Sequence, residues 1–397
     1  MPITFDSGAA VARLMRFLAV PGITGEEALI AAEIRRTLMA AGVPAAAIKF
    51  DDANLRIPFP TQTGNLLVTL PGTLKTAPRR LFMTHMDTVP LCAGAKPVLG
   101  DNRITNAANS ALGGDNRTGC AVLATLAAEL IRQKLPHPPL TLLFTVREES
   151  GLFGAKHLNP ADLGGPTLGF NIDSRLAGDL VVGAIGADRW EVDILGRASH
   201  AGVHPDRGIS ATVVASLAIE EMYREGWHGK ISKGGKEGTS NVGQFGDAAG
   251  NSAGNATNVV TDFVHIKGES RSHDAKFVRE ITAAFKAAFE RAARTVKDHQ
   301  GKTAKVKFTS RLDYVPFKLP ENAAVTKMAI AAAKSLKLKP ATKVTNGGLD
   351  ANWMVKHGIP TVTFGAGQND IHTVKEWVDL KEFDNGCRMA LTLATMD

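Results

Sequence analysis

The chain has 397 residues, of which 44% are hydrophobic, so it can bury a large core and is long enough for two domains. Its net charge of +7 comes from Lys and Arg residues that are scattered along the sequence, without the aromatic-basic motif of a nucleic-acid-binding module. No apolar run approaches the roughly 20 residues that a membrane-spanning helix needs. We therefore expect neither a nucleic-acid partner nor a membrane partner.

The cysteine content and the N-terminal sequence favour a cytoplasmic protein. Cys92, Cys120 and Cys387 form no CxxC pair, so the sequence supports neither a disulfide framework nor a thiolate zinc site. Cys120 lies in a helical apolar pattern, where a buried thiol is more common than a nucleophile. The N-terminus has neither a basic leader with an apolar stretch nor a small-residue cleavage site.

The first part of the chain mixes helical and strand patterns. Apolar residues recur with helical spacing over residues 9–41, and Gly22 and Gly25 interrupt them, which predicts two helices separated by a turn. Short apolar runs with the character of buried strands lie at 64–70, 80–87, 140–146, 167–173 and 361–365. With a predicted helix over 117–134, this order indicates an α/β body whose mainly parallel sheet is sandwiched by helices.

The middle third has a different pattern. In order, we predict a strand (189–198), a helix (208–226), two strands (239–245 and 258–266), a helix (273–298) and a strand (305–312). This β-α-β-β-α-β order is that of a small α+β unit of the ferredoxin-like type. Because the earlier pattern resumes after it, we predict one domain formed by residues 1–186 and 313–397, with residues 187–312 inserted as a second domain.

Acidic and histidine residues follow the strands predicted for the body. At the ends of three of them lie His85, Asp87, Glu148, Glu149 and Asp173. Since the carboxyl ends of neighbouring strands in an open α/β sheet border one crevice, we expect these side chains to converge. Asp115, just before the helix, and His372, in a loop after the last strand, can reach the same crevice.

Each of these signals is weak by itself, because adjacent glutamates are usually solvated and a His-x-Asp pair is more often structural. Together, imidazole and carboxylate groups form the mixed ligand set that zinc accepts, and pairs of metal ions about 3.5–4 Å apart recur in hydrolases. Buried carboxylates also need a compensating charge. The cluster therefore predicts a two-metal hydrolytic site.

Seven motifs resemble those of the di-zinc exopeptidases, the family that includes peptidase T, the glutamate carboxypeptidases and the aminoacylases. In order they are THMDTVP (84–90), GGDNRTG (113–119), REESG (147–151), NIDS (171–174), GRASHAGVHPDRGISA (196–211), NGGLDAN (346–352) and NDIHTVKEWV (369–378). The resemblance covers nearly the whole chain. It implies a zinc-exopeptidase catalytic domain, with the inserted domain as a lid or dimerisation domain, and a homodimer.

The resemblance also implies the ligands of two zinc ions. His85 and Asp173 would bind one ion. Glu149 and His372 would bind the other, and Asp115 would bridge both. Cobalt or manganese could replace zinc in such a ligand set.

Further roles follow from the same resemblance. Asp87 would hydrogen-bond a zinc-binding imidazole, and Glu148 would be the general base that passes a proton to the leaving amine. His200 resembles the lid histidine that stabilises the oxyanion, although without the resemblance a structural role in a tight turn is favoured. Arg271 resembles the arginine that binds a substrate carboxylate, and Asn258 is a weaker candidate for substrate contact.

The sequence departs from the family pattern at Asn116, where most members have a second aspartate after an unusual cis peptide. Asparagine keeps the size and the hydrogen-bonding capacity of aspartate, and this position is not the bridging ligand. We therefore expect activity to survive, although the fine geometry of the pocket should differ from that of relatives with aspartate.

The motifs look most like those of peptidase T and its relatives, and an aspartate at 173 tends to accompany aminopeptidase specificity in this family. The resemblance thus implies removal of the N-terminal residue from tripeptides or similar short peptides. N-acyl-amino-acid amidohydrolase or carboxypeptidase activity is the alternative within the family. An inactive relative that only binds peptides is the alternative of another class, disfavoured because all the ligand and base residues are present.

Overall fold

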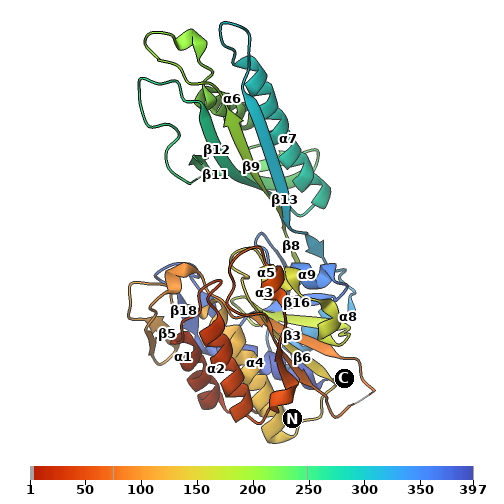
Figure 1. The fold of residues 1–397 in the computed structure, drawn as a ribbon. Helices are drawn as coiled ribbons and strands as arrows, with labels where there is room; N and C mark the ends of the chain where they lie inside the picture. Colours follow the sequence, from red (N-terminus) through yellow and green to blue (C-terminus); the bar gives the residue numbers. More distant parts are fainter. Residues whose placement is uncertain (1–3, 75, 248, 397) are drawn as a thin grey trace. The chain divides into compact units, whose positions relative to one another are not determined.

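The computed structural model of the chain describes residues 4–74, 76–247 and 249–396 (Figure 1). The chain divides into two compact units. The first is formed by Met1–Ala184 and Lys318–Asp397, and the second by Ile185–Phe317, which is inserted between these segments. The second unit continues beyond residue 312, since its last strand β13 (Lys305–Tyr314) extends to Tyr314.

The first unit is built on a nine-stranded sheet with the order β1-β2-β6-β3-β7-β16-β8-β14 and with β15 beside β8. Its strands are β1 (Ile48–Phe50), β2 (Leu66–Leu70), β3 (Arg80–His85), β6 (Leu140–Thr145), β7 (Leu168–Ile172), β8 (Asp179–Ala184), β14 (Phe317–Lys318), β15 (Ala341–Thr345) and β16 (Thr361–Phe364). Strands β6, β3, β7 and β16 are parallel neighbours, whereas β2 is antiparallel to β6. The predicted mainly parallel sheet is confirmed.

Helices cover both faces of this sheet. They are α1 (Ser7–Leu18), α2 (Ala28–Ala40), α3 (Ala53–Arg56), α4 (Gly114–Gln133), α5 (Phe153–His157), α8 (Ala324–Ser335), α9 (Asp350–Lys356) and α10 (Leu380–Thr395). Helix α4 is buried through Leu130, because it packs on β3 and β7 and is itself covered by α1, α2 and α10. Helix α9 packs on the opposite face, against β7 and β16, and Figure 1 shows it near α5.

A second, four-stranded sheet in this unit carries part of the site. Its order is β17-β18-β5-β4, with strands β4 (Pro97–Leu99), β5 (Arg103–Asn106), β17 (Gln368–Asn369) and β18 (Trp377–Asp379). The sequence pattern missed this sheet, because runs of two to four residues are too short to show a period. The loop between β17 and β18 contains His372.

The second unit has a five-stranded antiparallel sheet with the order β10-β11-β12-β9-β13 and two helices on one face. Its other elements are β9 (Gly186–Leu195), α6 (Ala211–Arg224), β10 (Gly229–Lys233), β11 (Lys236–Gly246), β12 (Phe263–Ser272) and α7 (Ala275–Thr295). Trp190 of β9 packs against Phe285 and Phe289 of α7, with ring centroids 4.7 and 6.2 Å apart. The predicted ferredoxin-like order is present, with β10 as an additional edge strand.

One predicted strand was placed wrongly. The pattern predicted a strand over 258–266, but β12 begins at Phe263. The backbone before it bonds to a loop instead of a neighbouring strand: the Ala201 amide donates to the Asn258 carbonyl at 2.9 Å, and the Val260 amide donates to the Ser199 carbonyl at 2.9 Å. An apolar run shows that a segment is buried but does not identify its hydrogen-bond partner.

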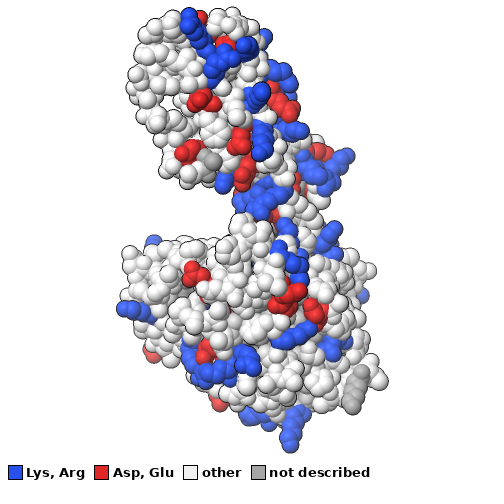
Figure 2. Space-filling view, viewed as in Figure 1, with Lys and Arg blue, Asp and Glu red and all other residues white. Residues whose placement is uncertain are grey.

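The surface carries charges of both signs. Figure 2 shows Lys and Arg side chains on both units, with Asp and Glu side chains among them. Over the described residues, no helix combines the length and the apolar character needed to cross a membrane.

We predict that Gly268→Ala destabilises the second unit. A Cβ atom at Gly268 would collide with the indole ring of Trp190, in the middle of the core, and overpacking of this kind costs about 1–3 kcal/mol. Denaturant unfolding followed by tryptophan fluorescence measures the loss. Gly243→Ala in β11 is the matched control, because its nearest neighbour atom, Asn241 Nδ2, would lie 3.7 Å away. Equal stability of the two variants would contradict this packing.

Candidate metal centre

The acidic and histidine side chains singled out in the sequence meet at one edge of the central sheet. His85 is the last residue of β3, and Asp173 directly follows β7. Glu148 and Glu149 lie in the turn after β6. These three strands are neighbours in the order β6-β3-β7, so their carboxyl ends lie side by side. Asp115 reaches the same place from the start of α4.

The bridging geometry is visible at Asp115, whose two carboxylate oxygens face two different imidazoles. Its Oδ1 lies 3.1 Å from His85 Nε2, and its Oδ2 lies 3.3 Å from His372 Nε2. Each imidazole has a second carboxylate beside it. Asp173 Oδ1 is 3.7 Å from His85 Nε2, and Glu149 Oε2 is 3.0 Å from His372 Nε2. The result is two half-sites that share one carboxylate.

These separations fit metal coordination. Zinc bonds of about 2.0–2.2 Å place neighbouring ligand atoms of a tetrahedron roughly 3.3–3.6 Å apart, close to the distances from 3.0 to 3.7 Å found here. Within the described ranges, the groups of side chains that could hold a metal ion are both in this cluster: His85 with Asp115 and Glu149, and His85 with Glu148 and Asp173. The donors present therefore fit two divalent ions.

Asp87 supports this cluster from behind. Its side chain is fully buried, and its Oδ1 lies 3.3 Å from His85 Nδ1, on the side of the ring opposite the ligand nitrogen. The same carboxylate accepts the backbone amides of Glu148 at 3.0 Å and Glu149 at 3.2 Å. One buried side chain thus orients the imidazole of one half-site and the turn that carries both glutamates.

Glu148 is suited to carry a proton. Its side chain is buried at the edge of the cluster, and burial, together with the negative charges of Asp173 and Glu149, raises its pKa well above the ordinary range of a glutamate, against the opposing effect of His85. A carboxyl group with a raised pKa is a better proton acceptor than an exposed glutamate.

Comparison with known proteins agrees with this geometry. The sequence profile of peptidase family M20/M25/M40 matches residues 81–396. The chain belongs to this peptidase family. It is 34% identical over 331 residues to the uncharacterised protein YqjE of Bacillus subtilis, covering 83% of this chain and 84% of the relative. It is 24% identical over 372 residues to peptidase T of Streptococcus pyogenes, with the same coverage.

Two solved structures are similar to this chain over nearly their whole length. A tripeptidase from Staphylococcus aureus has a TM-score of 0.87 at 29% identity and covers 99% of this chain and 98% of its own. The aminopeptidase PepT from Bacillus cereus has a TM-score of 0.84 at 30% identity and covers 98% of both chains. The resemblance to the di-zinc exopeptidases is confirmed at the level of the family, and the chain is a member of a metallopeptidase family.

Asn116 uses both ends of its amide, which accounts for an asparagine at a position where M20 relatives were expected to have aspartate. The Asp115–Asn116 peptide is cis. The Nδ2 of Asn116 donates to the Ile172 carbonyl at 2.7 Å, and its Oδ1 accepts from the Gly119 amide and from Gln368 Nε2, both at 2.9 Å. An ionised aspartate has no proton to donate to the Ile172 carbonyl.

Sequence reasoning missed Glu376, which connects two ligand-bearing segments. Its Oε2 accepts the Gly113 amide at 2.8 Å, and its Oε1 accepts the Asp115 amide at 3.0 Å, so it holds the backbone of the bridging ligand. It lies four residues after His372 in the same motif, and that spacing was the available signal. Asp350, in the motif NGGLDAN, was also given no role, although its carboxylate accepts from Thr145 at the end of β6.

The remaining site candidates, His200, Asn258 and Arg271, lie in the second unit. His200 is exposed, and its Nδ1 accepts the backbone amides of Gly202 at 3.2 Å and Val203 at 3.1 Å. The proton of the neutral ring is therefore on Nε2. Asn258 is exposed and bonds to Ala201 through its carbonyl.

Arg271 already has a carboxylate partner within the second unit. Its Nε donates to Glu269 Oε1 at 2.9 Å, and its second donor reaches Oε2 at 3.1 Å. Glu269 is shared with Arg189, which also pairs with Asp313 at 2.8 Å. A substrate carboxylate at Arg271 would therefore join an existing ion-pair network.

We predict that metal binding releases protons and strengthens as the pH rises. Burial and the charge of Asp115 raise the pKa of Glu149 to about 7, and hydrogen bonds to Asp115 and Glu149 raise the pKa of His372 to about 10. Because the metal-free cluster holds these protons at neutral pH, a divalent ion must displace them. Affinity should therefore increase with pH from about 6 to about 8.

Calorimetric titration of the metal-free protein with zinc, in buffers of different ionisation enthalpy, counts the released protons. Glu149→Gln is the comparison variant, because it removes one titrating ligand while the other residues of the cluster remain. Zinc affinity that does not change with pH, without proton release, would contradict the prediction.

Proposed function

We propose that this protein is a two-zinc aminopeptidase that removes the N-terminal residue of short peptides, with tripeptides as the preferred substrates. The observation that carries the proposal is Asp115, whose two oxygens lie 3.1 and 3.3 Å from imidazoles of two half-sites. A shared carboxylate between two imidazole-carboxylate pairs is the ligand arrangement of a two-metal hydrolase.

The substrate class is supported by the solved structures that resemble this chain. The tripeptidase and the aminopeptidase PepT are 29% and 30% identical to it over almost the whole chain. An aspartate at position 173 also favours the aminopeptidase side of the family. Zinc is proposed from the mixed nitrogen and oxygen donors, which cobalt and manganese also accept.

In the first unit, one set of residues would bind the metal ions and another residue would transfer protons. His85, Asp173, Glu149, His372 and the shared Asp115 would hold the two ions. When bound, zinc ions supply Lewis acidity that polarises the scissile carbonyl and increases the acidity of water.

Proton transfer is assigned to Glu148. It would take a proton from the attacking water and deliver it to the leaving amine, a task that suits its raised pKa. Asp87 keeps the Glu148 backbone and the His85 ring in fixed orientations during both transfers.

The second unit would supply polar contacts to the substrate. The Nε2–H of His200 is the donor we assign to the carbonyl oxygen as negative charge develops on it. Arg271 is proposed for a substrate carboxylate, since a guanidinium can bind a second anion while it keeps Glu269. Asn258 is proposed as a neutral contact to the peptide.

We also propose a cytoplasmic protein whose partner is the peptide substrate, without nucleic-acid or membrane partners. The three cysteines are buried and unpaired, which suits a reducing compartment. On the face shown in Figure 2, basic side chains are interspersed with acidic ones, so they do not form the continuous basic surface that is typical of a nucleic-acid-binding protein.

We expect zinc-loaded wild-type protein to cleave unblocked tripeptides and Glu148→Gln to lose at least about a thousandfold in kcat, because the proton carrier is removed while the metal ligands remain. Release of free amine is followed on two panels, tripeptides and N-acetylated amino acids. Zinc content measured on both proteins is the control. Cleavage of only the acetylated panel would assign the amidohydrolase alternative, and no cleavage of either panel with two bound ions would assign a peptide-binding protein.

We expect a homodimer through the second unit. Helix α6 exposes Val213, Leu217 and Tyr223 at 47%, 40% and 74%, and Phe245 of β11 is exposed at 44%. Burial of such a surface against a second copy would stabilise a pair. Light scattering after size exclusion should give twice 42.0 kDa for wild type. A Leu217→Lys/Tyr223→Ser variant should become a monomer, whereas Leu55→Lys on the first unit should not. A monomeric wild-type protein would rule out the dimer.

A further inference from the structure

In the turn that presents the two glutamates, the backbone amides are held by side chains from other segments. After β6 ends at Thr145, four consecutive backbone amides, those of residues 146–149, each donate to a buried side-chain oxygen. The acceptors are Asn65 Oδ1 at 3.0 Å, Glu27 Oε1 at 3.1 Å, Asp87 Oδ1 at 3.0 Å and Asp87 Oδ2 at 3.2 Å. Of these acceptors, Asp87 also faces a histidine of the cluster, whereas Glu27 has no assigned role.

This turn needs such support because of its backbone conformation. Arg147, directly before Glu148, has a φ of +51°, in the left-handed region that costs roughly 1–2 kcal/mol for a residue with a side chain. Arg147 lies after the end of β6 and before the start of α5, so its amide belongs to neither element and needs an acceptor from elsewhere. The Glu27 carboxylate supplies the acceptor for that amide.

Glu27 is an acceptor of backbone amides. Its side chain is fully buried, its Oε1 also accepts the Gly25 amide at 2.6 Å, and its Oε2 has no hydrogen-bond partner among the residues that the structure describes. Burial and the nearby charge of Asp87 raise its pKa to about 7. Burying a polar group of this kind costs free energy, and its role in positioning the turn at Arg147 explains its presence.

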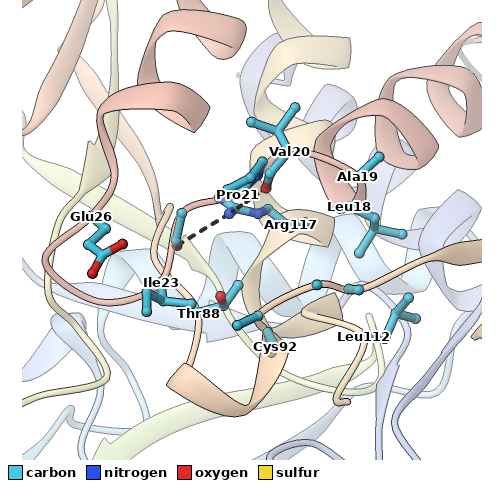
Figure 3. A pocket seen from close by; sticks show the side chains of 14 residues that line it. Leu18, Ala19, Val20, Pro21, Ile23, Glu26, Thr88, Cys92, Leu112 and Arg117 are labelled. Atoms are coloured by element: carbon cyan, nitrogen blue, oxygen red, sulfur yellow. Dashed lines mark hydrogen bonds between the residues drawn. The ribbon is translucent and has the colours of Figure 1, made fainter. Parts of the chain in front are cut away.

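The segment that carries Glu27 is itself hydrogen-bonded to Thr88 and Arg117, which lie close to residues of the cluster in the sequence. The Thr88 amide donates to the Gly22 carbonyl at 3.2 Å, and the Thr24 amide donates to the Thr88 carbonyl at 2.9 Å. Arg117 adds hydrogen bonds to the carbonyls of Val20 at 3.2 Å and Gly22 at 3.3 Å. In Figure 3 the Arg117 side chain lies against this segment, on the wall of a small cavity of about 150 Å³. Glu27 therefore projects from an anchored support.

We propose that Glu27 is a positioning residue for Glu148 and Glu149: it fixes the left-handed turn at Arg147, and through it the direction in which both carboxylates point into the cluster. The assignment of Glu148 as base rests on the proposed function, whereas the effect on Glu149 is an effect on metal binding. Loss of the Glu27 acceptor should therefore loosen one metal ligand and the base together, without removing either.

Three variants separate positioning from simple stability. Glu27→Ala removes the acceptor, and Glu27→Gln keeps one oxygen for the Arg147 amide. Glu129→Ala is the matched control, because Glu129 is also a buried carboxylate that accepts a backbone amide from a distant segment, that of Asp6 at 3.4 Å, at the far end of α4 from Asp115.

The experiment measures zinc affinity by competition with a chromophoric chelator, the visible spectrum of the cobalt-loaded protein, and kcat and KM on the tripeptide panel. Glu27→Ala should weaken the binding of one of two zinc ions by about tenfold or more, alter the cobalt spectrum and lower kcat more than it raises KM. Glu27→Gln should restore these values to within about threefold, and Glu129→Ala should lower only the melting temperature.

Two results would overturn the proposal. One is a folded Glu27→Ala protein with zinc affinities, cobalt spectrum and kcat equal to those of wild type. The other is the same set of losses in Glu129→Ala, which would make the effect one of general stability. If wild type cleaves no peptide, the aminopeptidase proposal fails, while the zinc affinities and the cobalt spectrum still decide whether Glu27 positions Glu149.

Discussion

Five carboxylates, those of Asp87, Asp115, Glu148, Glu149 and Asp173, are gathered with their side chains largely withdrawn from water, at the carboxyl ends of three parallel strands. Unpaired burial of one carboxylate costs several kcal/mol, and mutual repulsion increases that cost for a group of them. Two imidazoles compensate only part of the negative charge. The need for cations at this sheet edge is the constraint around which the first unit is arranged.

The protein meets this constraint by holding the ligand-bearing loops with further buried acceptors. Glu376 accepts two amides around Asp115, Asp87 accepts the amides of both glutamates, and Glu27 accepts the amide before them. In each case a side chain from a distant segment replaces the hydrogen bonds that a strand or helix would have supplied. Loops held in this way keep their ligands in place without regular structure, which a site with defined metal geometry requires.

The second unit, by contrast, is stabilised by a conventional hydrophobic core. Its helices bury one face of an antiparallel sheet around Trp190, while the other face carries the network of Arg189, Glu269 and Arg271. The two faces follow from the alternation of side chains along each strand. His200 lies in a loop outside this sheet, and the backbone amides on its Nδ1 determine which nitrogen carries the proton. The unit thus presents Arg271 on its sheet and His200 on a loop outside the sheet.

Sequence patterns alone predicted most strands, an inserted unit and a cluster of acidic and histidine residues, because burial periodicity and ligand chemistry are properties of short segments. They could not reveal that the two oxygens of Asp115 face different histidines, nor that Asn116 donates to the Ile172 carbonyl. They also misplaced the start of β12, and they assigned no role to Glu27 or Glu376. Each of these facts concerns which donor meets which acceptor across thirty or more residues of chain, and only tertiary packing decides that.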